Sequence, residues 1–279
     1  MNKQDDHFLI DNASPIEIAY TLRCLDPDIA YSTADLRARI MGDWGYEVQR
    51  NFTNSTRRLF DLGLAAPKKT SARKPGYVVT PLGLKVRSLA DLDHGLYKEA
   101  MHFLHFDGWD NCPTTRKLFW SYRKCCEFVW NKRVIPPTQD IVTYIQDKIA
   151  EDYSELFAQR KGGNFNAGGV NSGWKPWIAD LEPPVLGTDG QIMPRAMDRF
   201  EPTVLALDNV YRMNGYHYGD PVLLDDVLLD QIAQVFFLDV TRCRELIGLA
   251  ARLTRVIKLS DTFTGTSVTL LEPYTIERI

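Results

Sequence analysis

Residues 46–90 read YEVQRNFTNSTRRLFDLGLAAPKKTSARKPGYVVTPLGLKVRSLA, and their pattern predicts how the N-terminal part of the chain folds. Its first part predicts a helix from Tyr46 to Leu62, because inward-facing positions recur every three or four residues at Val48, Phe52, Ser55, Leu59 and Leu62. The period then changes to two, which predicts a strand over residues 62–67, a basic loop from Lys68 to Gly76 and a partner strand over residues 77–79. Thr80 and Pro81 begin a further helix.

Basic residues are concentrated in this stretch. It holds nine lysines and arginines against two acidic residues, a local charge of +7, and because the whole chain carries −3 the remainder carries −10. A basic block within a mildly acidic protein is typical of a module that binds a polyanion. The alternative is a solvated charged face with no partner.

Two shorter helices are predicted before this stretch. Residues 14–17, Ser-Pro-Ile-Glu, form a capping-box pattern in which Glu17 reaches back to Ser14, and the first helix ends before Asp26-Pro27-Asp28. A second helix begins at Ser32 or Thr33. On the third helix, the face opposite the buried stripe carries Arg, Asn, Gln and Thr, which are side chains that contact base edges and phosphates.

Three helices, a hairpin with a basic tip and a closing helix resemble a winged helix-turn-helix DNA-binding domain over about residues 12–90. The segments that carry the resemblance are residues 59–64 (LFDLGL), 68–74 (KKTSARK) and 77–83 (YVVTPLG). The resemblance implies that the third helix enters the major groove and that the hairpin lies near phosphate. The DNA-binding residues expected on this basis are Gln49, Arg50, Thr53, Asn54, Arg57, Lys68, Lys69, Arg73 and Lys74. A winged helix that serves only as a protein-protein adaptor would not need the +7 charge.

The middle of the chain, residues 94–200, is predicted to be helical with a glycine-rich loop. One aromatic helix spans Thr114 to Arg133, and a second begins at Thr138, after Pro136 and Pro137. Residues 161–200 are predicted to be mainly loop, and the glycines at 162–173 form no phosphate-binding P-loop because no Gly-Lys-Ser/Thr follows a strand.

The C-terminal part, about residues 201–272, repeats the order of helices and strands with a weaker signal. Helices are predicted over about 201–215, 225–237 and 240–254, followed by strands at 256–259 and 267–271. The residues that could contact a second DNA segment or a protein are Thr241, Arg242, Arg244 and Arg255. Aspartates surround them and would repel phosphate, so protein contacts are as plausible here as DNA contacts.

Two groups of residues deserve testing as catalytic or metal sites. His102 and His105, with Asp107, Asp110 and Cys112, have metal-compatible spacing but no second pair of ligands, and no CxxC motif occurs among the five cysteines. Asp220, Asp225, Asp226 and Asp230 could hold Mg²⁺, yet aspartates at a helix start are favoured by the helix dipole alone. We therefore expect no metal, no cofactor and no catalytic residue.

The sequence thus predicts a mainly α fold with short β-hairpin wings, in three parts: a winged helix at 1–93, a helical middle at 94–200 and a second winged helix at 201–279. The expected function is cytoplasmic, non-enzymatic binding of double-stranded DNA, as a transcriptional regulator or as an accessory subunit of a DNA-processing or phage-defence system. A protein partner or a homodimer fits both roles. No membrane span and no signal peptide are expected, because no apolar run is long enough and the N-terminus is acidic. The alternatives are a metal-dependent nuclease and a winged-helix protein adaptor.

Overall fold

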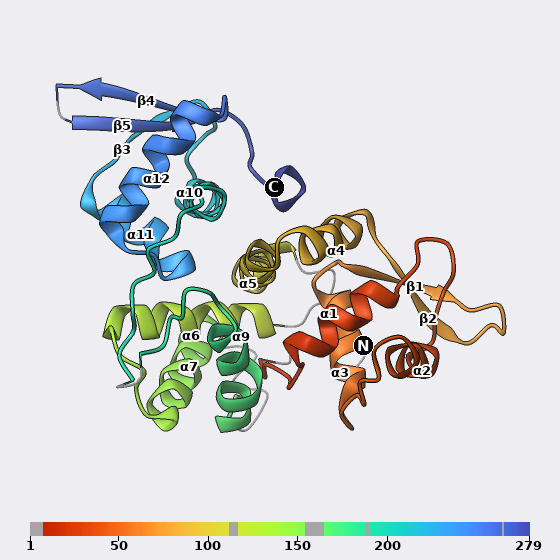
Figure 1. Cartoon of the computed structure of the whole chain (residues 1–279). Helices are drawn as coiled ribbons and strands as arrows, with labels where there is room; N and C mark the ends of the chain where they lie inside the picture. The colour runs from red at the N-terminus through yellow and green to blue at the C-terminus, as the bar shows by residue number, and fades with distance from the viewer. Residues whose placement is uncertain (1–7, 112–116, 154–164, 188–189, 264) are drawn as a thin grey trace. The chain divides into compact units, whose positions relative to one another are not determined.

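The computed structural model describes residues 8–111, 117–153, 165–187, 190–263 and 265–279 (Figure 1). These residues are mainly helical, with one two-stranded and one three-stranded antiparallel sheet, which confirms the mainly α class with short hairpins. None of the described helices has the length and apolar character that a bilayer span requires. Contacts divide the chain into two compact units, one within residues 1–128 and 136–180 and the other within 129–135 and 181–279, so the predicted middle part is shared between them.

The first unit begins with α1 (Pro15–Cys24) and α2 (Thr33–Trp44). The predicted capping box on α1 is wrong, because the Ser14 side chain makes no capping hydrogen bond. Instead the buried Glu17 carboxylate accepts hydrogen bonds from the Gln49 N–H at 2.5 Å and the Ser55 hydroxyl at 2.8 Å. A capping box does occur on α2, where the Ser32 and Asp35 side chains each accept the other's backbone N–H.

Helix α3 (Phe52–Asp61) begins six residues later than the predicted start at Tyr46. The segment before it is held outside a helix by long-range bonds: Glu17 takes the Gln49 N–H, and Arg37 donates to the Gln49 carbonyl at 3.3 Å. Because these backbone groups already have partners, the segment loses little by remaining extended. All five residues of the predicted inward stripe, including Val48 ahead of the helix, are buried.

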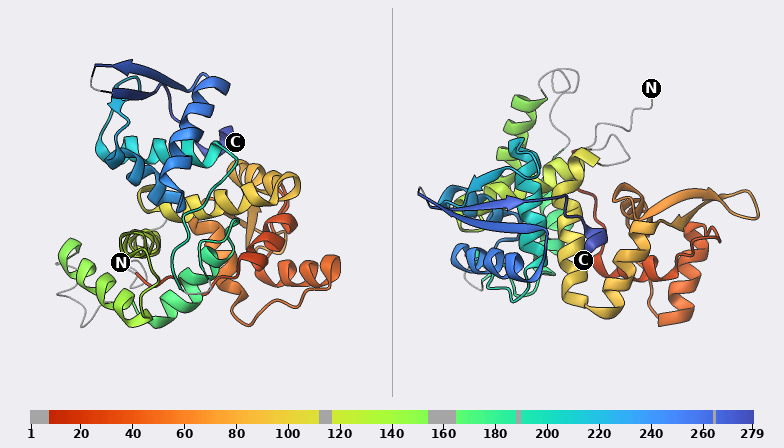
Figure 2. Two further views of the ribbon diagram at one scale, coloured as in Figure 1. Left: turned by 60° about the vertical axis from the view of Figure 1, so that its left-hand side comes forward. Right: turned by 90° about the horizontal axis from the view of Figure 1, so that it is seen from above.

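A hairpin follows, formed by β1 (Ala65–Lys69) and β2 (Pro75–Val79). The strands pair from Ala65↔Val79 to Lys69↔Pro75, so they extend further into the basic segment than predicted. Tyr31, between α1 and α2, pairs with Tyr77 on the other edge of β2 through backbone bonds of 2.9 and 3.1 Å. Helix α4 (Pro81–Leu92) then begins at Thr80, whose side chain accepts the Gly83 N–H as predicted. The hairpin projects from the helices of this unit (Figure 2).

The rest of the first unit is helical. It contains α5 (His94–Asn111), α6 (Leu118–Lys132) as far as Phe128, α7 (Thr138–Asp152), a π-helix (Gly169–Trp174) and α9 (Lys175–Ala179). The predicted helix from Thr138 is confirmed, and Val142, Ile145 and Ile149 are buried. Residues 169–179 are helical where a loop was predicted, and Trp174 and Trp177 are buried. The start of the glycine-rich stretch, residues 162–164, lies outside the described residues.

The second unit contains α10 (Glu201–Asn214), β3 (Pro221–Leu223), α11 (Asp226–Phe236), α12 (Val240–Leu253), β4 (Ile257–Thr262), β5 (Gly265–Leu270) and a short 3-10 helix (Ile276–Arg278). The three predicted helices and two predicted strands are confirmed, whereas β3 was missed. The strand order is β3-β5-β4. Both units therefore share one order of elements: a helix, a short strand or bridge, two helices, and a hairpin whose second strand pairs with that early segment.

Candidate nucleic-acid interface

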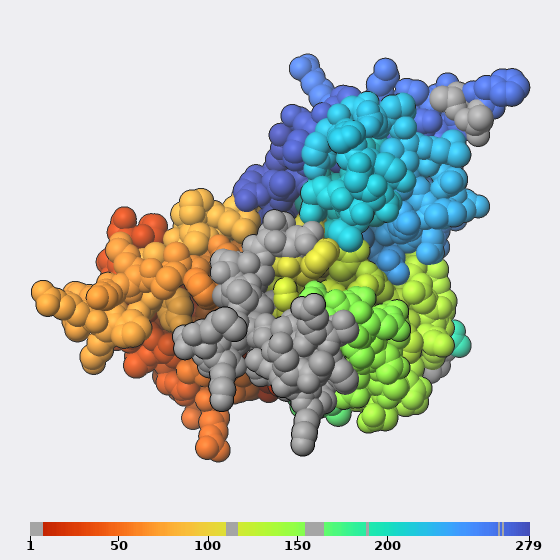
Figure 3. Space-filling model, turned by 180° about the vertical axis from the view of Figure 1, so that it is seen from behind, coloured from red at the N-terminus to blue at the C-terminus, as the bar shows by residue number. Residues whose placement is uncertain are grey.

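The hairpin tip is a closed five-residue loop, Thr70 to Lys74. The Thr70 N–H donates to the Lys74 carbonyl at 2.9 Å, and the Lys74 N–H donates to the Thr70 hydroxyl at 3.1 Å. Arg73 has a positive φ of 59°, which turns the chain back toward β2. The lysines and the arginine of the hairpin are all exposed. The segment that carries them, in orange in Figure 3, projects from the surface of the first unit. The tip therefore presents its cations from a backbone of fixed conformation.

The four hairpin cations differ in how they are compensated. The Lys68 ammonium donates to the Asp28 carbonyl at 2.8 Å, so this side chain lies against its own unit. Hydrogen bonds from Ser32 and, less strongly, the charge of Lys74 lower the pKa of Asp35, which places Lys74 within electrostatic range of a carboxylate. Lys69 and Arg73 form no ion pair with any described residue. These two cations are the most available to a phosphate.

The DNA-binding residues predicted on the third helix lie partly before α3 and partly within it. Gln49 and Arg50 are exposed but precede the helix, whereas Thr53 is exposed on its first turn. Arg57 is half-buried and one turn further along. The side-chain amide of Asn54 donates to the Asn12 carbonyl at 3.2 Å, so it is engaged within the chain.

Arg37 is a site residue that the sequence analysis missed. It is exposed on α2, donates to the Gln49 carbonyl, and places its guanidinium 5.6 Å from the centre of the Phe52 ring. It therefore positions the segment that carries Gln49 and Arg50. The signal that could have found it is the alternation of Arg37 and Arg39 on the second predicted helix, just outside the basic stretch.

Arg58 contributed to the local charge of +7 but does not lie on the surface. It is 1% exposed, and it donates to His105 Nε2 at 2.9 Å and to the Asp11 carbonyl at 3.2 Å. Asp61 is buried as well, so the net charge of the exposed groups is unaltered. Arg58 thus links α3 to α5 within the first unit.

The tautomer of His105 follows from its two partners. Its Nδ1 lies 2.7 Å from the Met101 carbonyl, which only accepts, so Nδ1 carries the proton and Nε2 accepts from Arg58. Burial, and then the charge of Arg58, hold the pKa of His105 well below its usual value. A neutral imidazole is the form that fits between a guanidinium and a carbonyl.

Five of the residues weighed as metal or catalytic sites, two histidines and three aspartates, have other partners. His102 Nδ1 lies 2.9 Å from the Tyr122 hydroxyl, and His105 is held by Arg58. Cys112 and the Asp110 side chain lie outside the described residues. Asp225 caps α11, Asp226 pairs with Arg244, and Asp230 accepts from Trp130 and Arg133. Within the described ranges, no three histidines, cysteines or carboxylates are grouped as metal ligands.

The repeated module in the second unit has a different electrostatic character. Arg242 donates to Met197, Glu245 and Asp198, and Arg244 donates to the Leu224 carbonyl and to Asp226. Of its predicted contact residues, Thr241, Arg244 and Arg255 are exposed. Arg242 and Arg244 are thus paired with carboxylates of their own module, unlike Lys69 and Arg73, whereas Arg255 forms no ion pair with a described residue. Comparisons of the chain with protein-family models, with curated proteins and with solved structures found no match.

Proposed function

We propose that this protein binds double-stranded DNA through its N-terminal module. The observation that carries the proposal is the pair of exposed, uncompensated cations, Lys69 and Arg73, on a hairpin that projects beside a short polar helix. Arg50 and Arg57 extend the same charge toward α3. In the winged-helix arrangement that the order of elements resembles, α3 lies at the major groove and the hairpin lies against the phosphates.

The electrostatics of this module favour a polyanion over a protein partner. From Leu62 to Ala90 the chain has no acidic residue, so nothing in the hairpin repels phosphate. Exposed side chains at the tip are polar, small or cationic. The tip itself, residues 70–74, has none of the aromatic or large aliphatic side chains that anchor protein interfaces.

The second module supports a protein contact better than a DNA contact. Arg242 and Arg244 are paired with carboxylates, and Leu223, Val227 and Phe263 are exposed apolar side chains. A module that binds DNA and a module that binds protein, on one chain with no catalytic role, suit either a regulator or an accessory subunit of a DNA-processing or phage-defence system. A regulator is expected to bind the DNA upstream of its own gene at least about 1,000-fold more tightly than random duplex. Equal affinity for the two would favour the accessory subunit.

A charge-reversal experiment tests the DNA-binding proposal. A fluorescent duplex of about 20 base pairs, two helical turns, is titrated by anisotropy with wild type and with Lys69→Glu/Arg73→Glu/Lys74→Glu. The matched control is Arg252→Glu/Lys258→Glu/Arg278→Glu, which changes the net charge equally on exposed residues of the second unit, none of which is a predicted contact residue.

The hairpin variant is expected to weaken binding by about 100-fold or more, because three phosphate contacts become repulsive, while the control stays within about threefold of wild type. An equal loss in both variants would show that only net charge matters. Wild type that does not bind duplex at low salt would refute the proposal.

A further inference from the structure

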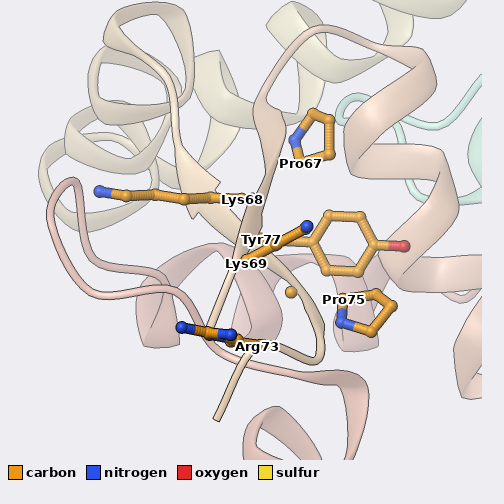
Figure 4. A pocket seen from close by; sticks show the side chains of 7 residues that line it. Pro67, Lys68, Lys69, Arg73, Pro75 and Tyr77 are labelled. Carbon is orange, nitrogen blue, oxygen red and sulfur yellow. The ribbon is translucent and has the colours of Figure 1, made fainter. Parts of the chain in front are cut away.

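One face of the hairpin combines an aromatic ring with prolines and a lysine. Directly opposed residues of an antiparallel pair lie on the same face, and faces alternate along each strand. The pairs Pro67↔Tyr77 and Lys69↔Pro75 therefore share one face, and Lys68↔Gly76 lies on the other. Figure 4 shows the Tyr77 ring between Pro67 and Pro75, with Lys68 directed away from it.

A cavity of about 320 Å³ opens on this hairpin. The lining residues are Pro67, Lys68, Lys69, Arg73, Pro75, Gly76 and Tyr77. The volume is at the lower end of the range for small-ligand sites, about 300–1,000 Å³. Its floor is a ring and two prolines, and its rim carries Lys69 and Arg73, neither of which forms an ion pair with a described residue.

The position of Tyr77 is fixed by its backbone. Tyr31 exchanges two backbone hydrogen bonds with Tyr77, and the neighbouring Gly76 leaves no room for a side chain. A Cβ at position 76 would lie 2.8 Å from the Thr70 methyl group and 2.9 Å from the Tyr31 carbonyl oxygen. The Tyr77 ring is half-exposed, so this ring, the Tyr77 platform, is both held in place and accessible.

We infer that this cavity binds an unpaired nucleotide of a DNA strand that continues from the bound duplex. The inference rests on the proposed function. A nucleobase stacks on an aromatic ring, and its phosphate pairs with a cation, so the floor and the rim match the two halves of one nucleotide. A bare phosphate would gain nothing from the apolar floor, and a base pair inside a duplex is stacked on both faces and offers none to Tyr77. The cavity thus favours the end of a duplex or a junction over its interior.

The test compares two probes with the full chain. One is a blunt duplex of about 20 base pairs, and the other is the same duplex with a short single-stranded extension whose first unpaired base is 2-aminopurine. The extended probe is expected to bind about tenfold tighter, with quenching of the 2-aminopurine fluorescence as it stacks. Each polarity of extension is measured.

Variants assign the effect to the ring. Tyr77→Ala is expected to remove the tenfold preference while blunt-duplex affinity stays within about threefold, and Tyr77→Phe is expected to keep both. Tyr216→Ala, which removes an exposed tyrosine of the second module, is the matched control and should keep the preference. Blunt-duplex affinity shows whether each variant is folded. The quenching of 2-aminopurine fluorescence is measured on wild type and so tests the stacking without any substitution.

The outcomes separate this inference from the proposed function. Equal affinity for the two probes, with blunt-duplex binding intact, would overturn the unpaired-nucleotide site and leave DNA binding in place. Failure to bind either probe at low salt would overturn both. Thymidine monophosphate is added as a competitor of the extended probe. If it abolished the quenching at concentrations near the Kd of that probe, the cavity would be a site for free nucleotides, and the inference that it binds a nucleotide within a DNA strand would be overturned.

Discussion

Acid sensitivity of folding is the most specific consequence of the contact that holds α3. The folded state keeps His105 neutral because its Nε2 faces the Arg58 guanidinium at 2.9 Å, in a fully buried position. Burial and Arg58 lower its pKa in the folded state, whereas an unfolded histidine has an ordinary pKa of about 6.5. The unfolded state therefore binds more protons as the pH falls. The stability that His105 contributes is present above about pH 6.5 and is lost progressively below it.

The expected magnitude follows from this linkage. If His105 stays neutral in the fold down to pH 5, lowering the pH from 7.5 to 5.0 reduces the free energy of unfolding by about 2 kcal/mol. The loss per pH unit approaches about 1.4 kcal/mol once the pH is below 6.5, where the unfolded histidine is protonated. His105→Gln replaces the imidazole with a neutral group that does not titrate. The variant is expected to lose stability at pH 7.5 but to have a pH dependence smaller by about 2 kcal/mol over the same range.

Urea denaturation at several pH values, followed by circular dichroism, measures this difference. His217→Gln removes an exposed histidine and serves as the matched control; its pH dependence should equal that of wild type. A His105→Gln profile parallel to that of wild type would show that His105 is not the neutral, buried acceptor described here.

Three further predictions concern buried positions elsewhere in the chain. Glu17→Gln should cost about 1–3 kcal/mol in urea denaturation, because the acceptor of the Gln49 N–H and the Ser55 hydroxyl is weakened in a buried position; a cost near zero would contradict that role. Gly83→Ala should destabilise the protein by about 1–3 kcal/mol, since its Cβ would lie 2.1 Å from the Leu64 carbonyl, while Gly42→Ala, with open space around it, should not. Burial raises the pKa of Cys24 to about 11, that of Cys243 to about 12, and those of Cys125 and Cys126 as well. Iodoacetamide at pH 8 should therefore leave all four unmodified until urea unfolds the chain, and rapid native labelling by mass spectrometry would refute their burial.

Local patterns predicted the helices well and their starts less well. The stripe from Val48 to Leu62 is buried as its spacing predicted, because side-chain periodicity reports burial directly. The predicted start of α3 was wrong because the carboxylate of Glu17, 32 residues before Gln49, accepts a hydrogen bond from the Gln49 N–H. The same contact removed Glu17 from the predicted capping box. Such a long-range bond leaves no trace in the local spacing of residues.

The candidate site was predicted in part. The hairpin and its exposed lysines follow from the alternating pattern and the run of basic residues. Arg57 and Arg58 are adjacent and chemically identical, yet only Arg58 is buried, and the helical phase of Ser55 and Leu62 would have placed position 58 on the inward row. The Tyr77 platform needed the strand register Pro67↔Tyr77, which the sequence does not specify. Strand β3, with three residues, is too short for a periodic signal.

The salt dependence of duplex affinity reports how many cations of this module contact phosphate. If Arg50, Arg57, Lys69, Arg73 and Lys74 each neutralise a phosphate, log K should fall with log salt with a slope of about −4.5, so that affinity drops about 500-fold between about 50 and 200 mM salt. Lys69→Ala/Arg73→Ala should reduce that slope by about 1.8. A wild-type slope near zero, or a slope that the double variant leaves unchanged, would show that the hairpin does not contact the DNA backbone.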